Sequence, residues 1–235
     1  MSKDEALEFF YQGIEILENA GENLSTRDRR DAISLLSLAI KKVDNVFPRA
    51  HSLLAMLYYE HEDSNSADHH ASTALEQDED EFRAQFVKMQ IAADKVQVVE
   101  GSVAGSIMPR GIGAKHLFGS VFRAGKAAVV SGQVAATQLK FKNEVNTLIE
   151  IFQRLCSYEE MPAIEFTYCA GQLMSLADFI VEHEIPMPGG KPNIFSVIAN
   201  SSTENIIYDE EYIEQERNEV NRVKRLAEGR ALSFR

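Results

Sequence analysis

Apolar residues recur along most of this chain at the three- and four-residue spacing that places them on one face of an α-helix. Between Glu5 and Asn19, for example, Leu7, Phe10, Ile14 and Leu17 share one face. The same spacing predicts helical segments over residues 31–42, 49–60, 67–77, 79–98, 114–129, 145–155, 166–180 and 209–227. The apolar segment 194–199 is too short to assign. No segment shows the two-residue alternation of a strand, so we expect an all-α fold.

Two of these helical segments match each other at a fixed offset of about 35 residues. The equivalent positions are Ala32 and Ala67, Leu36 and Ala71, and Ala39 and Ala74. A repeat of this length is typical of units that cannot bury their apolar faces alone and therefore stack on a neighbour. Small residues at these positions let two antiparallel helices approach closely, so the pattern indicates stacked helical hairpins.

The second of these units resembles the tetratricopeptide (TPR) repeat. The TPR consensus has a Leu and a small residue in its first helix, an aromatic residue one turn later, and two alanines around a larger apolar residue in its second helix. The residues at these positions, with no gap between Pro48 and Asp80, are Leu54, Ala55, Tyr58, Ala67, Ala71 and Ala74. Gly13 and Ile16 open a weaker match upstream if the turn Gly21 to Asp28 is an insertion of roughly seven residues. The resemblance implies a short array of about five helices that offers a surface to partners.

The resemblance also implies which residues face a partner. In TPR arrays the first helix of each repeat lines a concave surface, and the corresponding residues here are Arg49, Ser52, Met56 and Tyr59. Members that clamp the C-terminal carboxylate of chaperones have a Lys and an Asn at two of these positions, whereas this chain has Ser52 and Met56. We therefore expect a partner helix or extended segment that contacts Met56 and Tyr59. The alternative is that these side chains cover a docked C-terminal half.

Glycine and proline residues predict where the array ends. One more period would place glycines and then Pro109 inside a helix, where each glycine costs about 1 kcal/mol and proline removes a hydrogen bond. We expect a TPR-like repeat domain over 1–98, a Gly-rich connection over 99–113 and a helical C-terminal region over 114–235. Because a free-standing array usually needs three full repeats, we expect the C-terminal region to pack on it.

The charge of the chain is acidic and unevenly distributed. A net charge of −12 and a pI near 5.0 argue against nucleic-acid binding, which favours basic surfaces. Residues 101–143 are the exception, because they contain six basic and no acidic side chains. Within them, the predicted helix 114–129 places Lys115, Arg123 and Lys126 opposite bulky apolar residues, a pattern typical of helices on anionic membrane surfaces.

Packing within the protein or against a second subunit is the favoured interpretation of that helix. Each large apolar side chain contributes roughly 1.5–3 kcal/mol when it is buried. Each basic residue near anionic lipid contributes only about 1 kcal/mol. Burial therefore dominates, and a membrane surface stays the alternative.

Motifs for catalysis and for cofactors are incomplete. The segment Gly119 to Lys126 has one residue too many between its glycines for a phosphate loop. His61, His69 and His70 lie near acidic residues, but neighbours on a helix point in different directions, which favours a solvated polar face over a metal site. Cys156 and Cys169 lack metal-type spacing and are expected to be buried thiols. We expect no catalytic residue, no cofactor and no metal.

Together these patterns favour a non-enzymatic protein-interaction module, such as an adaptor, scaffold or assembly factor, that binds another protein. No apolar run reaches the ~18 residues of a membrane-spanning helix, and the acidic start does not resemble a signal peptide, so we expect a cytoplasmic protein. A homo-oligomer stays open. The alternative function is a peripheral membrane-surface adaptor that uses the helix 114–129, and an enzyme of unfamiliar type is less favoured.

Overall fold

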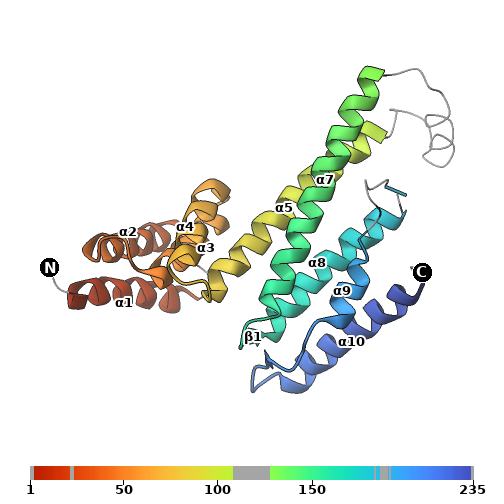
Figure 1. Ribbon diagram of the computed structural model, residues 1–235. Coiled ribbons are helices and arrows are strands. Elements are labelled where there is room, and N and C mark those ends of the chain that lie inside the picture. The colour runs from red at the N-terminus through yellow and green to blue at the C-terminus, as the bar shows by residue number, and fades with distance from the viewer. Residues whose placement is uncertain are drawn as a thin grey trace. The chain divides into compact units, whose positions relative to one another are not determined.

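The computed structural model describes residues 3–21, 24–107, 128–182, 184–185, 190 and 192–233, and these residues form an all-α fold (Figure 1). The helices are α1 (Lys3–Ala20), α2 (Thr26–Lys42), α3 (Pro48–Glu60), α4 (Ser64–Gln77), α5 (Phe82–Ile107), α7 (Ala128–Leu155), α8 (Ala163–Glu182), α9 (Ile194–Asn200) and α10 (Ile213–Ser233). The two-residue strands β1 (Met161–Pro162) and β2 (Ile206–Ile207) pair in parallel, with Met161 opposite Ile206. The chain divides into two compact units, Met1–Ile91 and Ala92–Arg235.

Helix α7 begins at Ala128, 17 residues before the predicted segment 145–155, and helix α5 extends beyond its predicted end. Helix α5 continues to Ile107, where the sequence predicted an end near Val98 and a Gly-rich connection over 99–113. The glycines of this stretch lower helix stability by about 1 kcal/mol each. Extending an existing helix, however, adds one hydrogen bond per residue and needs no new nucleus. The penalty is therefore too small to end the helix at Val98.

Two smaller differences lie near the C-terminal end. Helix α10 begins at Ile213 rather than at the predicted Asp209, because the Asp209 carboxylate accepts a hydrogen bond from the backbone N–H of Glu211 at 2.8 Å and holds a turn there. Helix α9 forms in the segment that was too short to assign. Its N-cap, Asn193, accepts a hydrogen bond from the backbone N–H of Ser196 at 3.0 Å, which stabilises the first turn of this short helix.

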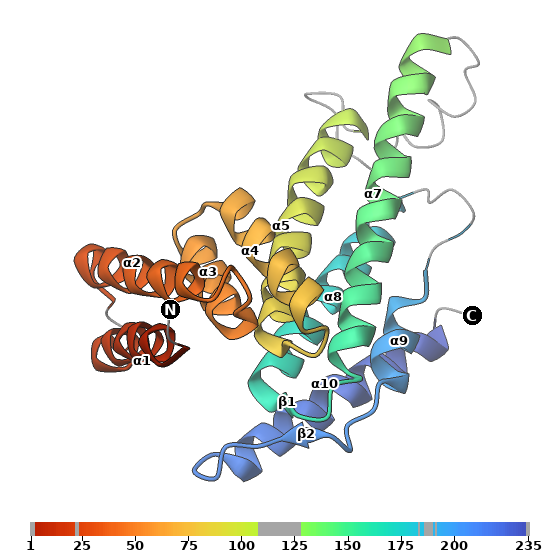
Figure 2. The ribbon, with the colours of Figure 1, turned by 60° about the vertical axis from the view of Figure 1, so that its left-hand side comes forward.

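The unit Met1–Ile91 consists of stacked helical hairpins, as the repeat predicted. Helix α1 packs on α2, α3 packs on α4, and α2 also contacts α3 (Figure 2). The core between the first three helices consists of Phe10, Ala32, Leu36, Ala39, Ile40, Ala50, Leu53, Leu54 and Leu57. Gly13 allows α1 to approach α2 closely, because a Cβ atom at this position would lie 3.2 Å from Leu36 Cγ.

Alanines fill the interface between α3, α4 and the start of α5. The members of this alanine cluster are Ala55, Ala67, Ala71, Ala74, Ala84, Val87 and Ile91, and none is more than 2% exposed. The predicted burial of Ala55, Ala67 and Ala74 is therefore confirmed. Small side chains here bring the helix backbones together, and the resemblance to TPR repeats stays a prediction.

The unit Ala92–Arg235 is built around α8, which contacts α7, α9 and α10. Its core buries both predicted apolar stripes, which are Val145, Leu148, Phe152 and Leu155 on α7 and Phe166, Cys169, Leu173, Leu176 and Ile180 on α8. Cys156 and Cys169 are free and buried, as predicted. Burial raises the pKa of the Cys156 thiol to about 12 and also raises that of Cys169. The packing of the C-terminal region on the array stays a prediction.

Candidate partner-binding cleft

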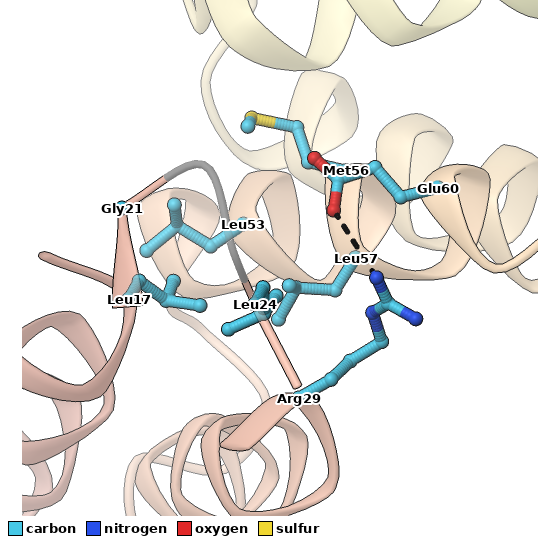
Figure 3. Close-up of a pocket in the computed structure, with 8 residues that line it drawn as sticks. All are labelled: Leu17, Gly21, Leu24, Arg29, Leu53, Met56, Leu57 and Glu60. Carbon is cyan, nitrogen blue, oxygen red and sulfur yellow. Dashed lines mark ion pairs between the residues drawn. The ribbon is translucent and has the colours of Figure 1, made fainter. Parts of the chain in front are cut away.

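A cleft of about 300 Å³ lies on the unit Met1–Ile91, between the end of α1, the start of α2 and one face of α3 (Figure 3). Its lining is mainly aliphatic, with one cation and one anion. The lining residues are Leu17, Gly21, Leu24, Arg29, Leu53, Met56, Leu57 and Glu60. A concave, largely apolar site with few polar groups is the usual form of a binding site in proteins.

Local sequence signals position the three walls of the cleft. Gly21 has a φ of +52° and donates its N–H to the carbonyl of Leu17 at 3.1 Å, so α1 ends at the cleft. Ser25 begins α2 as its N-cap and accepts a hydrogen bond from the Asp28 N–H at 3.1 Å, which confirms the predicted cap. Arg29 follows one turn later, and it therefore projects from the first turns of α2.

Helix α3 supplies the third wall through the residues of one face. Leu53, Met56, Leu57 and Glu60 are spaced by three and four residues, which aligns them along the helix. Leu53 and Leu57 are buried and form the floor, whereas Met56 is half-buried. The Glu60 side chain is 49% exposed. The wall therefore changes from apolar to acidic toward the end of α3.

The Arg29 guanidinium is the unusual group of this cleft. Its side chain is only 21% exposed, and Nη2 lies 4.0 Å from Glu60 Oε2, which is too long for a hydrogen bond (Figure 3). Nε is buried, and within the part of the chain that the structure describes no protein group accepts a hydrogen bond from it. Buried arginines usually have acceptors, so this cation is poorly satisfied by the protein itself.

The four residues predicted to face a partner do not lie on one common surface. Met56 lines the cleft, and Arg49 is exposed outside it. Tyr59 is half-buried and packs against the alanine cluster. Ser52 is fully buried, and its hydroxyl donates to the Arg49 carbonyl at 3.0 Å. In this arrangement Ser52 is a packing residue, because its small side chain is covered inside the unit.

The sequence itself indicates that Arg29 lies on the buried side of α2, although the repeat pattern drew attention to other residues. Arg29 lies three residues before Ala32 and seven before Leu36, both of which are buried. These spacings place the cation on the apolar face of α2 rather than on its solvent face. Lys115, Arg123 and Lys126, predicted for an anionic surface, lie outside the described residues, as does most of the predicted helix 114–129.

A second depression, of about 400 Å³, lies beside α2, α3 and α4 and has three histidines in its lining. Here His51 Nδ1 and His70 Nδ1 are 2.9 Å apart, and His51 Nε2 lies 3.3 Å from the Asn45 carbonyl. His70 also stacks on Tyr58, with ring centroids 5.4 Å apart. The predicted solvated face is therefore wrong for His70, which is half-buried because its ring fits between Tyr58 and His51.

Burial keeps both of these histidines neutral. It is the main cause that lowers the pKa of His51 and that lowers the pKa of His70 to about 4, and a proton on His51 would further oppose protonation of His70. In the described ranges, no cluster of three or more His, Cys, Asp or Glu side chains is arranged to hold a metal ion.

A third depression of about 450 Å³, in the unit Ala92–Arg235, is lined mainly by small polar residues beside Cys156. The raised pKa of Cys156 keeps its thiol protonated and therefore unreactive. None of the lining residues that the structure describes for this depression is charged. Of these three sites, the cleft of α1, α2 and α3 is the one that places a partly buried arginine beside several aliphatic side chains.

The chain was compared with family models, with curated proteins and with solved structures, and none of them matches it. In the part of the chain that the structure describes, no helix combines the length and the apolar character needed to cross a membrane. The function proposed below therefore rests on the residues of the cleft.

Proposed function

We propose that the protein is a non-enzymatic protein-interaction module that binds a partner protein in the cleft between α1, α2 and α3. The observation that carries this proposal is the poorly satisfied Arg29 guanidinium within an aliphatic lining. Such a site combines apolar area, which supplies affinity, with a directional donor, which supplies specificity. The resemblance of α3 and α4 to a TPR hairpin supports the same class of function.

The chemistry of the lining also favours binding over catalysis. Arginine stays protonated at all physiological pH values and so does not act as a general base. Glu60 is half exposed, and among the lining residues that the structure describes there is no Ser, Cys or Lys nucleophile. Five of the eight lining residues in the described part of the chain are Leu or Met, a composition that suits the burial of a partner's apolar side chain.

Affinity capture from native lysate tests this proposal. We expect Met56→Glu to lose at least nine-tenths of the captured partner, because it places a carboxylate where the partner would bury apolar surface. Leu17→Glu, on the opposite wall of the cleft, should have the same effect. Val46→Glu is the control, since Val46 is 66% exposed and is not part of the lining. If both cleft variants stay folded and capture every partner of the wild type, this function is wrong.

A further inference from the structure

The hydrogen-bond donors and acceptors of the cleft indicate which polar groups a bound partner presents, in addition to its apolar side chain. A guanidinium carries five N–H donors, yet among the described residues none accepts a hydrogen bond from the buried Nε of Arg29, and the carboxylate recorded beside Nη2 is that of Glu60 at 4.0 Å. Other arginines of this chain behave differently, since both Arg222 and Arg230 donate to carboxylates. Arg29 and Glu60 are therefore close enough to act as a pair on one ligand and too far apart to satisfy each other.

A main-chain amide suits this arrangement better than a carboxylate does. Arg29 and Glu60 together are electrically neutral, and a ligand carboxylate bound between them would face the Glu60 carboxylate across a few ångströms. Like charges at such a distance repel strongly where water is partly excluded. A peptide residue, in contrast, offers a carbonyl to Arg29 and an N–H to Glu60 without adding charge.

Extended backbone provides the required geometry. In an extended residue the N–H and C=O of the same residue point to the same side, as they do when two strands pair. A helical residue cannot present both groups, because its own hydrogen bonds occupy them. Side chains of extended residues stand out from the hydrogen-bonding plane, so the residue that contacts Arg29 and Glu60 can direct its side chain toward Leu53 and Leu57.

We infer that the partner binds as an extended peptide segment: one residue gives its carbonyl to Arg29 and its N–H to Glu60, and inserts a large aliphatic side chain into the cleft. This inference rests on the proposed function and adds the chemical class of the partner to it. The main-chain contacts set the direction of the peptide, and the 300 Å³ cleft selects the side chain.

Neutral blocked peptides test the inference on the full chain. The probe is acetyl-Ser-Thr-Leu-Thr-Ser-amide, whose β-branched residues favour extended backbone, and the readout is the Met56 methyl signal in a methionine-labelled NMR spectrum. We expect a saturable shift of this signal. The same peptide with Ala in place of Leu should bind at least tenfold more weakly, and acetyl-Ser-Thr-Leu with a free carboxylate should also bind more weakly.

Arg29→Met separates the main-chain contact from apolar burial. It keeps the aliphatic stem and removes the donors, and the described residues accept no hydrogen bond from Nε that it would delete, so we expect a folded protein. Its affinity for the Leu peptide should fall about tenfold, the loss expected for one charge-assisted hydrogen bond. The control variant Val46→Ala should bind like the wild type. If Arg29→Met does not fold, the Leu and Ala peptides still test the inference on the wild type.

Three results would overturn this inference: no saturable shift of Met56, equal affinity for the Leu and Ala peptides, or tighter binding of the free carboxylate. A helical partner that contacts Met56 would also give the first result. These failures are distinguishable from failure of the proposed function. If the peptides fail while Met56→Glu still loses its captured partner, only the extended-peptide inference falls.

Discussion

At the scale of single residues, the contact between His51 and His70 fixes the protonation of both rings. Nε2 of His51 can bond the Asn45 carbonyl only as a donor, so Nδ1 of the same ring carries the lone pair. His70 Nδ1 must then donate to it across 2.9 Å. Protonation of both rings would place two N–H donors face to face, and therefore acid breaks this contact between α3 and α4.

The contact predicts a loss of stability in mild acid. The pKa of His70 is lowered in the folded chain to about 4 from an ordinary value of 6.5, so the unfolded chain takes up a proton first. The stabilising contribution is complete above pH 6.5 and is lost as the pH falls toward 4. Because the ring is only half-buried, we expect a decrease of about 1–2 kcal/mol in the free energy of unfolding.

Denaturant unfolding at several pH values measures this decrease. His70→Asn is the matched variant, since its amide N–H can replace the Nδ1–H donor but does not titrate. Carboxylates titrate in both proteins, so their contribution cancels when the free energy of unfolding of the variant is subtracted from that of the wild type at each pH. Equal pH dependence in the two proteins between pH 6.5 and 4 would contradict the prediction.

At the scale of elements, the close approach of α1 and α2 depends on a missing side chain. A Cβ atom on Gly13 would lie 3.2 Å from Leu36 Cγ and 3.3 Å from Leu36 Cδ2. Leu36 is fully buried, and a buried side chain in a well-packed core can shift only if its neighbours shift too. The separation of the two helices, and with it the width of the adjacent cleft, is therefore set by glycine.

Gly13→Val should destabilise the first hairpin by about 1–3 kcal/mol, because its branched side chain overpacks the contact with Leu36. Gly171→Ala in α8 is the comparison, since nothing lies within 4 Å of a Cβ atom there. This second change should stabilise the chain by about 0.5–1 kcal/mol through helix propensity. Thermal unfolding measures both, and a stable Gly13→Val protein would show that the helices can separate at little cost.

Much of the fold could be predicted from the sequence, because burial and helix geometry act over short distances along the chain. The spacing of Ala32 and Leu36 identified the buried face of α2, and Ser25 identified its start. The candidate site was harder. The repeat pattern predicted that Ser52 lies at the surface, but such a pattern does not show which small residues are buried. The residues around Arg29 come from three helices, which only the folded chain brings together.

At the scale of the whole molecule, charge is the least evenly distributed property. Six basic side chains and no acidic one occur in residues 101–143, whereas the full chain has a net charge of −12. The remaining residues therefore carry −18, the difference between −12 and +6. An acidic protein of this kind repels anionic surfaces at long range unless the basic segment faces them.

We expect the wild-type chain to bind anionic vesicles no better than neutral ones, since burial of the apolar face of residues 114–129 contributes more than contacts of lysine and arginine with lipid. Co-sedimentation with phosphatidylserine and phosphatidylcholine vesicles measures this. Strong binding to the anionic vesicles, lost in Arg123→Glu/Lys126→Glu, would instead establish the peripheral membrane adaptor as the better description.

The alanine cluster also has a consequence for recognising kin of this chain. At positions where the helix backbones nearly touch, evolution can accept only Gly, Ala or Ser, because any larger residue would push α3, α4 and α5 apart. The outward faces of the same helices are free to change. A distant homologue should therefore keep small residues at the positions of Ala55, Ala67, Ala71, Ala74 and Ala84 long after overall identity has faded.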